Sequence, residues 1–227
     1  MGLLNDFFKL IFPVTCAACG KILVKNERVI CLSCNYNLPR TSFHYDCNNP
    51  VSRIFWGRIR IENATAFYFF NKGSSFRHLV HELKYNNRKD IGLELGEIFG
   101  YELSAVEGFS HVDIVIPVPL HRKKLKKRGF NQSEFIARGI SKALYKPLDV
   151  MSVIRSFNSS TQTRKNRYDR WLNVAGIFTV INPDNLRNKH ILLVDDVITT
   201  GATIEACATE ILKVEGTAVS IAALAVA

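Results

Sequence analysis

The chain has 227 residues, of which 47% are hydrophobic and 22% charged, and a formal net charge of +10. This composition is typical of a globular protein and excludes collagen-like, coiled-coil and intrinsically disordered classes. No apolar run approaches the roughly 20 residues that a membrane-spanning helix needs. The N-terminus carries neither the basic region of a secretory signal nor a myristoylation motif. We therefore expect a cytoplasmic protein without membrane insertion.

The excess of positive charge is confined to two segments. Residues 122–128 (RKKLKKR) carry six basic side chains and no acid, and residues 155–170 carry five basic side chains and one acid. Such concentration favours a focused site for an anion, which would be nucleic acid, a polyphosphate or an acidic partner. Two solvated basic loops are the alternative interpretation.

Two pairs of cysteines near the N-terminus have the spacing of metal ligands. Cys16 and Cys19 form the first pair, and Cys31 and Cys34 form the second. Two such pairs complete the tetrahedral shell of a structural zinc site, which leaves no open position for catalysis. Zinc would then stabilise a small module, and its loss should unfold that module and spare the rest of the chain. A disulfide or simple buried thiols are the competing interpretations.

The rest of the chain predicts alternating strands and helices. Apolar residues between positions 3 and 11 predict a short N-terminal helix, and residues 38–60 are aromatic and irregular. We then expect, in chain order, strand 64–70, helices 76–87 and 90–103, strand 112–116, helix 131–144, strand 191–194, helix 202–214 and strand 218–226. Buried strands that alternate with helices predict an α/β fold, in which helices cover both faces of a parallel sheet.

This pattern divides the chain into two expected units. Residues 1–60 would form the N-terminal helix and zinc-binding module, and residues 61–227 the α/β domain. Residues 155–173 are polar, basic and too long for an ordinary connector, which is typical of a lid or a disordered loop.

The segment 191–203, ILLVDDVITTGAT, joins an apolar strand to two acids and a turn that opens a helix. In a parallel sheet the ligand crevice lies beyond the carboxyl ends of the strands, where Asp195 and Asp196 emerge. Their carboxylates can accept hydrogen bonds from sugar hydroxyls, and we expect Asp196 to be exposed in the empty site. The turn offers backbone amides, hydroxyls and a helix N-terminus to a phosphate, through Thr199, Thr200, Gly201, Ala202 and Thr203. The alternative is that the threonines only cap a helix and the acids only end a strand.

The same segment resembles the signature of the phosphoribosyltransferase family. The resemblance implies that Asp195 and Asp196 are the catalytic acids and hold the ribose 2′- and 3′-hydroxyls of phosphoribosyl pyrophosphate (PRPP). It implies that residues 199–203 hold the 5′-phosphate. The implied fold is of the type I phosphoribosyltransferase kind, with a parallel sheet, flanking helices and a flexible hood.

The order of motifs narrows the resemblance further. A double-cysteine module precedes IPVPLHRKKLKKRGFNQSE at 116–134, QTRKNRYDRWLNV at 162–174 and the PRPP segment. This order is similar to the ComF family, which are competence-associated phosphoribosyltransferase-like proteins with a double-zinc-ribbon-like cysteine module. The resemblance covers nearly the whole chain. Only Cys47 follows the first four cysteines here, which implies a single zinc.

The resemblance also implies contacts that flank the PRPP segment. The basic run at 122–128 would meet the pyrophosphate, with Mg²⁺ accompanying PRPP. The polar residues expected nearest to it are Arg128, Gly129, Asn131 and Gln132. The hood would close over the reacting centre through Gln162, Thr163, Arg164 and Arg167. Lys84, Tyr85 and Arg88 resemble a further polar segment of the family, which would line the acceptor side.

Two functions are expected from these features. The first is an enzyme that transfers phosphoribosyl from PRPP to a nitrogen acceptor with release of pyrophosphate, associated with DNA uptake in natural transformation. The alternative is a non-catalytic module of the same fold that binds single-stranded DNA or a DNA-uptake helicase. In that case Phe130, Tyr168 and Trp171, near the basic runs, would stack on bases. The sequence predicts neither the acceptor, nor its general base, nor the oligomeric state.

Overall fold

The computed structural model describes residues 13–70, 75–155 and 177–227. The expected N-terminal helix and most of the expected hood, including Gln162, Thr163, Arg164 and Arg167, lie outside these ranges. Within the described part of the chain, no helix is both long and apolar enough to cross a bilayer.

The centre of the fold is a four-stranded parallel sheet with the strand order β1-β6-β5-β2. Its strands are β1 (Ala64–Phe69), β2 (Ile114–Pro117), β5 (His190–Ile198) and β6 (Ala218–Val226). The four strands expected from the sequence are therefore present. Strand β5 continues past its expected end at Val194, because β6 pairs with it as far as Ile198 opposite Val226.

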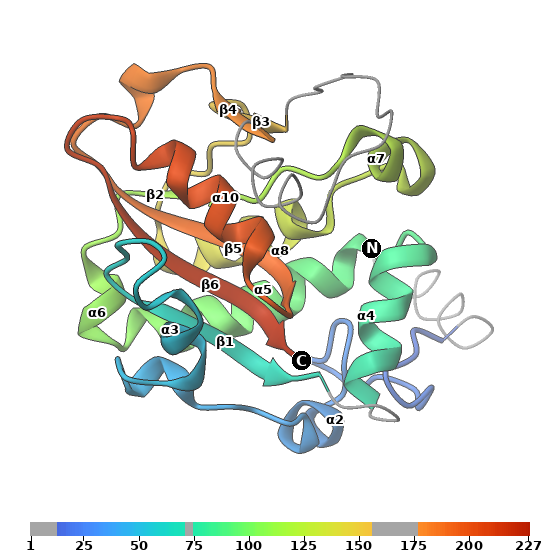
Figure 1. Ribbon diagram of the computed structural model, residues 1–227. Coiled ribbons are helices and arrows are strands. Elements are labelled where there is room, and N and C mark those ends of the chain that lie inside the picture. Colours follow the sequence, from blue (N-terminus) through green and yellow to red (C-terminus); the bar gives the residue numbers. More distant parts are fainter. Residues whose placement is uncertain (1–12, 71–74, 156–176) are drawn as a thin grey trace.

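Helices cover both faces of the sheet, as Figure 1 shows. Side chains of β5 alternate between the faces, so Leu192 and Val194 share one core with α4 (Ser75–Tyr85), α5 (Lys89–Ser104) and α8 (Gln132–Leu144). Ile191 and Leu193 share the other core with α3 (Pro50–Phe55) and α10 (Ala202–Ile211). The α/β architecture predicted from the alternation of strands and helices is confirmed.

The structure corrects two local expectations. Residues 38–60 are not irregular throughout, because Asn49 caps α3 by accepting hydrogen bonds from the backbone N–H groups of Val51 and Ser52. The basic run at 122–128 is not a loop but helix α7 (Arg122–Arg128), which begins after His121 and ends at Gly129. The φ of Gly129 is +80°, a conformation that glycine adopts without steric cost.

The remaining elements are short. They are α2 (Leu32–Asn37), the 3-10 helix η1 (Phe43–Tyr45), α6 (Glu107–Ser110), β3 (Val153–Arg155), β4 (Phe178–Val180) and the 3-10 helix η2 (Pro183–Asn185). Strands β3 and β4 pair antiparallel in a separate two-stranded sheet.

The segment with the cysteine pairs packs against the α/β core. Cys16 and Cys31 are buried in the same cluster as apolar residues of α4 and α5. Arg28 forms ion pairs with Glu94 at 2.9 Å and Glu97 at 3.3 Å, both on α5. The division of the chain near residue 60 stays a prediction, and the structure shows that residues on either side of it share cores.

Candidate functional site

The two acids lie at the end of β5, beyond the last residue that pairs with β2. Strand β2 pairs with β5 only as far as Pro117 opposite Val194, whereas β6 accompanies β5 past Asp195. Asp195 and Asp196 are partly buried. The strand therefore projects both carboxylates past its shorter neighbour, at the sheet edge where α/β folds bind ligands.

The surrounding framework holds the Oδ1 atom of each acid. Oδ1 of Asp195 accepts hydrogen bonds from the Ser133 hydroxyl and from the backbone N–H of Asp196, both at 2.8 Å. Oδ1 of Asp196 accepts from the backbone N–H of Val197 at 2.7 Å. These framework bonds use Oδ1 of each acid. The Oδ2 atom of each acid is therefore available to other partners.

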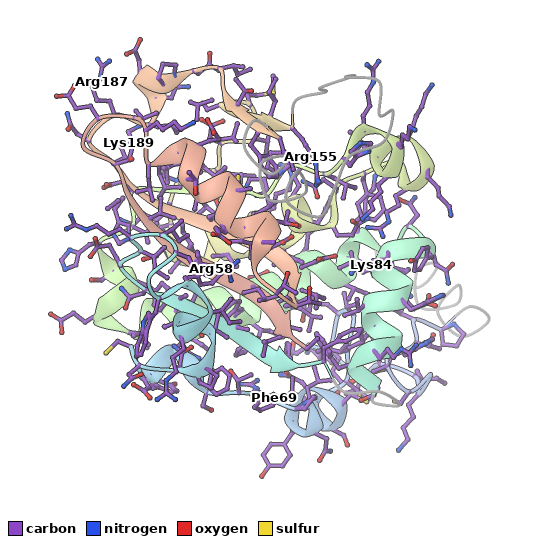
Figure 2. All side chains as sticks on the ribbon, viewed as in Figure 1. Arg58, Phe69, Lys84, Arg155, Arg187 and Lys189 are labelled. Atoms are coloured by element: carbon purple, nitrogen blue, oxygen red, sulfur yellow. The ribbon has the colours of Figure 1, made fainter. Side chains whose placement is uncertain are left out.

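A lysine from a distant helix occupies Oδ2 of Asp196. Nζ of Lys84, near the end of α4, lies 2.7 Å from this oxygen. Figure 2 shows Lys84 at the end of α4 that faces the sheet edge. The expectation that Asp196 is exposed is therefore wrong, because its side chain retains only 18% of its exposure and is paired.

The two acids have different electrostatic surroundings. Burial, together with the negative charge of Asp196, raises the pKa of Asp195 from 3.8 to about 7, although Ser133 and Lys84 act in the opposite direction. Burial lowers the pKa of the Arg155 guanidinium, at the end of β3, and the negative charge of Asp195 opposes this shift. Asp195 therefore holds its proton to a higher pH than an ordinary aspartate does.

The threonine-rich turn after β5 forms one wall of a pocket. The pocket has an empty volume of about 240 Å³, including space open to solvent, and is lined by residues 195 and 197–204. Thr199, Thr200 and Thr203 are exposed. Helix α10 begins at Ala202, whose backbone N–H lies 3.5 Å from Oγ1 of Thr200, and the N-cap residue Gly201 has no side chain to cap the first turn. Backbone N–H groups and hydroxyls therefore meet at a helix N-terminus, an arrangement that can bind a phosphate.

Gly201 and Arg58 fix the shape of this turn. Gly201 has a φ of +75°, and a Cβ at this position would lie 2.7 Å from Cγ2 of Ile54 on α3. Nη1 of Arg58 donates to the backbone carbonyls of Ile54 at 3.0 Å and Thr200 at 3.2 Å, and its Nη2 pairs with Glu205. The turn is thus held against α3, a helix that the sequence analysis does not predict.

The residues expected near the pyrophosphate have distinct roles. Nη1 of Arg128 donates to Oε1 of Gln132 at 2.6 Å, and the guanidinium lies 5.5 Å from the ring centroid of Tyr85. Asn131 caps α8, and its Nδ2 donates to the carbonyl of Val118 at 3.0 Å. Asn131 and Gln132 are buried. Arg128 therefore contacts Tyr85, the neighbour of Lys84 on α4, whereas Asn131 has a structural role at the start of α8.

Helix α7 presents a basic surface. Lys123, Lys124, Lys126 and Lys127 are exposed, and the helix contains no acid. Phe130, beyond the end of α7, is only 5% exposed and packs edge-to-face on Phe135. The expectation that Phe130 stacks on bases is wrong, because its ring is buried; Tyr168 and Trp171 lie outside the described residues.

The four expected cysteine ligands form one compact group. The Sγ atoms of Cys16, Cys19, Cys31 and Cys34 all lie within 4.8 Å of one another. Sγ of Cys19 and Sγ of Cys31 are 3.8 Å apart, and a tetrahedral ion with metal–sulfur bonds of about 2.3 Å requires this edge length. All six cysteines are free of disulfides, and Cys47 is exposed and outside the group.

The thiols of this group have opposite pKa shifts, since burial and the neighbouring thiols raise the pKa of Cys34. Burial raises the pKa of Cys16, but backbone N–H groups, led by that of Cys31, outweigh burial and bring this pKa down to about 7. A metal binds the thiolate form of cysteine. The four cysteines therefore fit a structural metal ion, and the donor set of four sulfurs favours zinc.

Comparisons with known proteins agree with this architecture. Residues 131–226 match the phosphoribosyl transferase domain family. DNA utilization protein YhgH of Escherichia coli (strain K12) is 27% identical over 210 residues, which cover 91% of this chain and 87% of that protein. Competence protein ComFC of Bacillus subtilis (strain 168) is 26% identical over 213 residues, which cover 88% of this chain and 84% of that protein. Competence protein F of Haemophilus influenzae is 32% identical over 93 residues, which cover 40% of this chain and 41% of that protein.

The parallel sheet, its flanking helices and the domain match define a phosphoribosyltransferase-like protein. Within that class, the matches to a DNA utilization protein and a competence protein over most of the chain's length support a ComF-family protein, in agreement with the resemblance in the order of the motifs.

Three residues of the site were not predicted, or were predicted only loosely, from the sequence. Lys84 was expected to line the acceptor side, which stays a prediction, and its ion pair with Asp196 was not predicted. Ser133 and Arg58 were not singled out, although Ser133 holds Asp195 and Arg58 holds the threonine turn. Ser133 directly follows Asn131 and Gln132, and its short hydroxyl at the start of a helix was the only available signal.

Proposed function

We propose that the chain binds PRPP at the edge of the sheet formed by the end of β5. The observation that carries this proposal is the arrangement of two acids beside a threonine-lined pocket. Asp195 and Asp196 accept the ribose 2′- and 3′-hydroxyls, because their Oδ1 atoms are held by the framework and their Oδ2 atoms can take further hydrogen bonds. The acids and the turn are close in sequence, so the sugar and the 5′-phosphate of one PRPP molecule can contact both at once.

The threonine turn binds the 5′-phosphate in this proposal. The N-cap residue Gly201 offers no side-chain cap to the start of α10, and the Ala202 backbone N–H makes only a long 3.5 Å contact with the Thr200 hydroxyl, so a phosphate can satisfy the backbone N–H groups there. The hydroxyls of Thr199, Thr200 and Thr203 add donors, and the positive end of the helix dipole favours the anion. Gly201 and Ala202 present no bulky side chain to the phosphate.

The pyrophosphate would lie toward α7. Arg128 supplies a cation there, the backbone at Gly129 ends the helix, and Gln132 holds the guanidinium. Mg²⁺ would accompany PRPP and neutralise part of the pyrophosphate charge. The acid pair does not fit a resident divalent ion, because Lys84 already occupies one of its oxygens. Gln162, Thr163, Arg164 and Arg167 are proposed to close over the bound ligand, as a hood that excludes water.

The proposed reaction is transfer of phosphoribosyl to a nitrogen acceptor. The bond between C1 of the ribose and the pyrophosphate oxygen breaks, a bond between C1 and the acceptor nitrogen forms, and the nitrogen loses a proton. Asp195 and Asp196 are the residues that orient the sugar for this displacement. Zinc at Cys16, Cys19, Cys31 and Cys34 is proposed to be structural, because four thiolates leave no position for substrate.

The proposal is tested by calorimetric titration with PRPP and Mg²⁺, followed by an assay of pyrophosphate release over a panel of nucleobases and amines. Saturable binding that is lost on mutation of the acid pair is the expected result. Absence of binding would refute the proposed site, and binding without turnover would refute the transferase reaction while leaving the site intact.

A second candidate function is handling of single-stranded DNA or binding of a DNA-uptake helicase. The exposed basic helix α7 favours it, since four lysines without a neighbouring acid in the helix can contact successive phosphates. The names of the relatives, DNA utilization protein and Competence protein, also favour a link to DNA and competence. Both functions can coexist, because the four exposed lysines of α7 are distinct from Arg128 and from the acid pair.

A further inference from the structure

The ion pair between Lys84 and Asp196 joins α4 to the end of β5. The side chains of Lys84 and Asp196 are 19% and 18% exposed, and Nζ and Oδ2 are 2.7 Å apart. Lys84 precedes the segment 131–226 that matches the phosphoribosyl transferase domain family. Binding a neutral sugar diol does not require a cation at this oxygen, so the pair needs an explanation of its own.

Two neighbouring carboxylates can serve two kinds of ligand. Their hard anionic oxygens are good ligands for Mg²⁺ or Mn²⁺, and they are equally good acceptors for hydroxyl groups. In this site the framework occupies Oδ1 of both acids, through Ser133 and two backbone N–H groups. The choice between a metal and a diol therefore depends on what surrounds the two Oδ2 atoms.

Lys84 favours the diol for electrostatic reasons. A divalent ion would bind Oδ2 at about 2.0–2.1 Å, so it would lie no farther than about 4.8 Å from Nζ, which is 2.7 Å from the same oxygen. Two cations at this separation in a partly buried site repel strongly. A hydroxyl carries no charge, and a carboxylate oxygen can accept a second hydrogen bond beside that of Lys84.

We propose that Lys84 is a specificity-determining residue that excludes divalent cations from the acid pair and reserves it for sugar hydroxyls. In the ligand-free protein the pair then stays free of metal, and a divalent ion reaches the site only with a ligand that supplies its own oxygens. The assignment of the diol rests on the proposed function, whereas the exclusion of metal can be tested without PRPP.

The test is a titration of the full-length, zinc-loaded chain with Mn²⁺ in the absence of PRPP, with free Mn²⁺ measured by electron paramagnetic resonance. Wild type should bind Mn²⁺ no better than Asp196→Asn. Lys84→Met should gain one site that binds at least about tenfold more tightly, because the nearby positive charge is gone. The gained site should disappear in the double variant Lys84→Met with Asp196→Asn.

Two control variants separate charge from other effects. Lys84→Arg keeps the charge and should behave as wild type. Lys213→Met removes a lysine that pairs with Glu210 at 2.6 Å, and it should also behave as wild type, because Glu210 is not part of the acid pair. Circular dichroism and zinc content check the fold, and Lys84→Gln, which keeps a hydrogen-bond donor, carries the same expectation should Lys84→Met fail to fold.

Three results would overturn the proposal. These are a wild-type Mn²⁺ site that Asp196→Asn removes, no gain of a site in either uncharged variant, and a gain of the same size in Lys84→Arg. Calorimetry of the wild type with PRPP is run in parallel. Failure of PRPP to bind would refute the proposed function and leave the Mn²⁺ result as a separate measurement.

Discussion

Replacing Asp196 by asparagine tests the proposed diol site most directly. The substitution keeps the shape of the side chain but removes the charge of one acceptor. A hydrogen bond to a charged group contributes about 1.5–3 kcal/mol, so we expect PRPP affinity to fall by roughly 10- to 150-fold. Calorimetric titration of the wild type and of Asp196→Asn with PRPP and Mg²⁺ measures the loss.

The same substitution should also lower stability, because it breaks the ion pair with Lys84. The two side chains are 18% and 19% exposed, so the pair is neither fully exposed nor fully buried. A surface ion pair contributes at most about 1 kcal/mol, and disruption of a fully buried pair costs about 3–5 kcal/mol. We expect the free energy of unfolding to fall by about 1–2 kcal/mol and the melting temperature by about 2–8 °C. On the sequence alone, with Asp196 exposed, the melting temperature would hardly change.

Lys84→Met is the matched control for this experiment. It breaks the same ion pair but keeps both carboxylates, so its PRPP affinity should change far less than that of Asp196→Asn when Mg²⁺ is kept equimolar with PRPP, so that little free ion competes for the acid pair. If Asp196→Asn bound PRPP as tightly as the wild type, the acid pair would be structural. If both variants lost affinity equally, the ion pair and not the acceptor would be responsible, and our assignment of the diol contact would be refuted.

Three further predictions concern the acid pair, the cysteines and the basic helix. The folded state holds a proton on Asp195 up to a pKa of about 7, whereas an unperturbed aspartate releases it near 3.8. This group should therefore make the free energy of unfolding fall as pH rises between these values. Chemical denaturation at several pH values should show a shallower fall in Asp195→Asn than in the wild type, and the same fall as in the wild type in the exposed control Asp184→Asn. Metal analysis should find about one zinc per chain. Cys31→Ser should destabilise the α/β core as well as the module, because Cys31 is buried with residues of α4 and α5. An unchanged hydrogen-exchange pattern in α5 of this variant would contradict the second prediction. If α7 contacts single-stranded DNA with four cations, log affinity should fall against log salt with a slope of about −3. Fluorescence anisotropy should show a flatter slope in a variant in which four lysines are neutralised together, namely Lys123, Lys124, Lys126 and Lys127. A wild-type protein with no salt-dependent binding would rule out DNA binding at this surface.

Most of the fold could be predicted because its elements are strongly patterned. The apolar runs at 191–194 and 218–226 fill the middle of the sheet, and both appear as strands of a parallel sheet. Helix α3 was missed because it is short and depends on the Asn49 cap and on contacts with β1. The basic run at 122–128 was treated as a loop because like charges disfavour a helix, yet the His121 cap and Gly129 give α7 both of its ends.

The site could be predicted only where its residues are close in sequence. The acids and the threonine turn lie within one short segment, so their chemistry is readable from the pattern alone. Lys84 and Asp196 are far apart in the chain, and their contact depends on how α4 packs beside β5. Likewise, the link from Arg58 to the carbonyl of Thr200 exists only because α3 packs against the turn. Single-sequence periodicity carries no information about such contacts.

These distant contacts show that residues before the matched segment 131–226 complete the site. Without β2, strand β5 would lose the parallel partner that holds it as far as Val194. Without α4, Asp196 would lose Lys84, and without α3 and Arg58 the threonine turn would lose the groups that fix its shape. The cysteine segment packs on α5, which itself packs on α8, whose Ser133 holds Asp195. The N-terminal half of the chain therefore determines the electrostatics and rigidity of a site whose recognisable motif lies entirely in the C-terminal half.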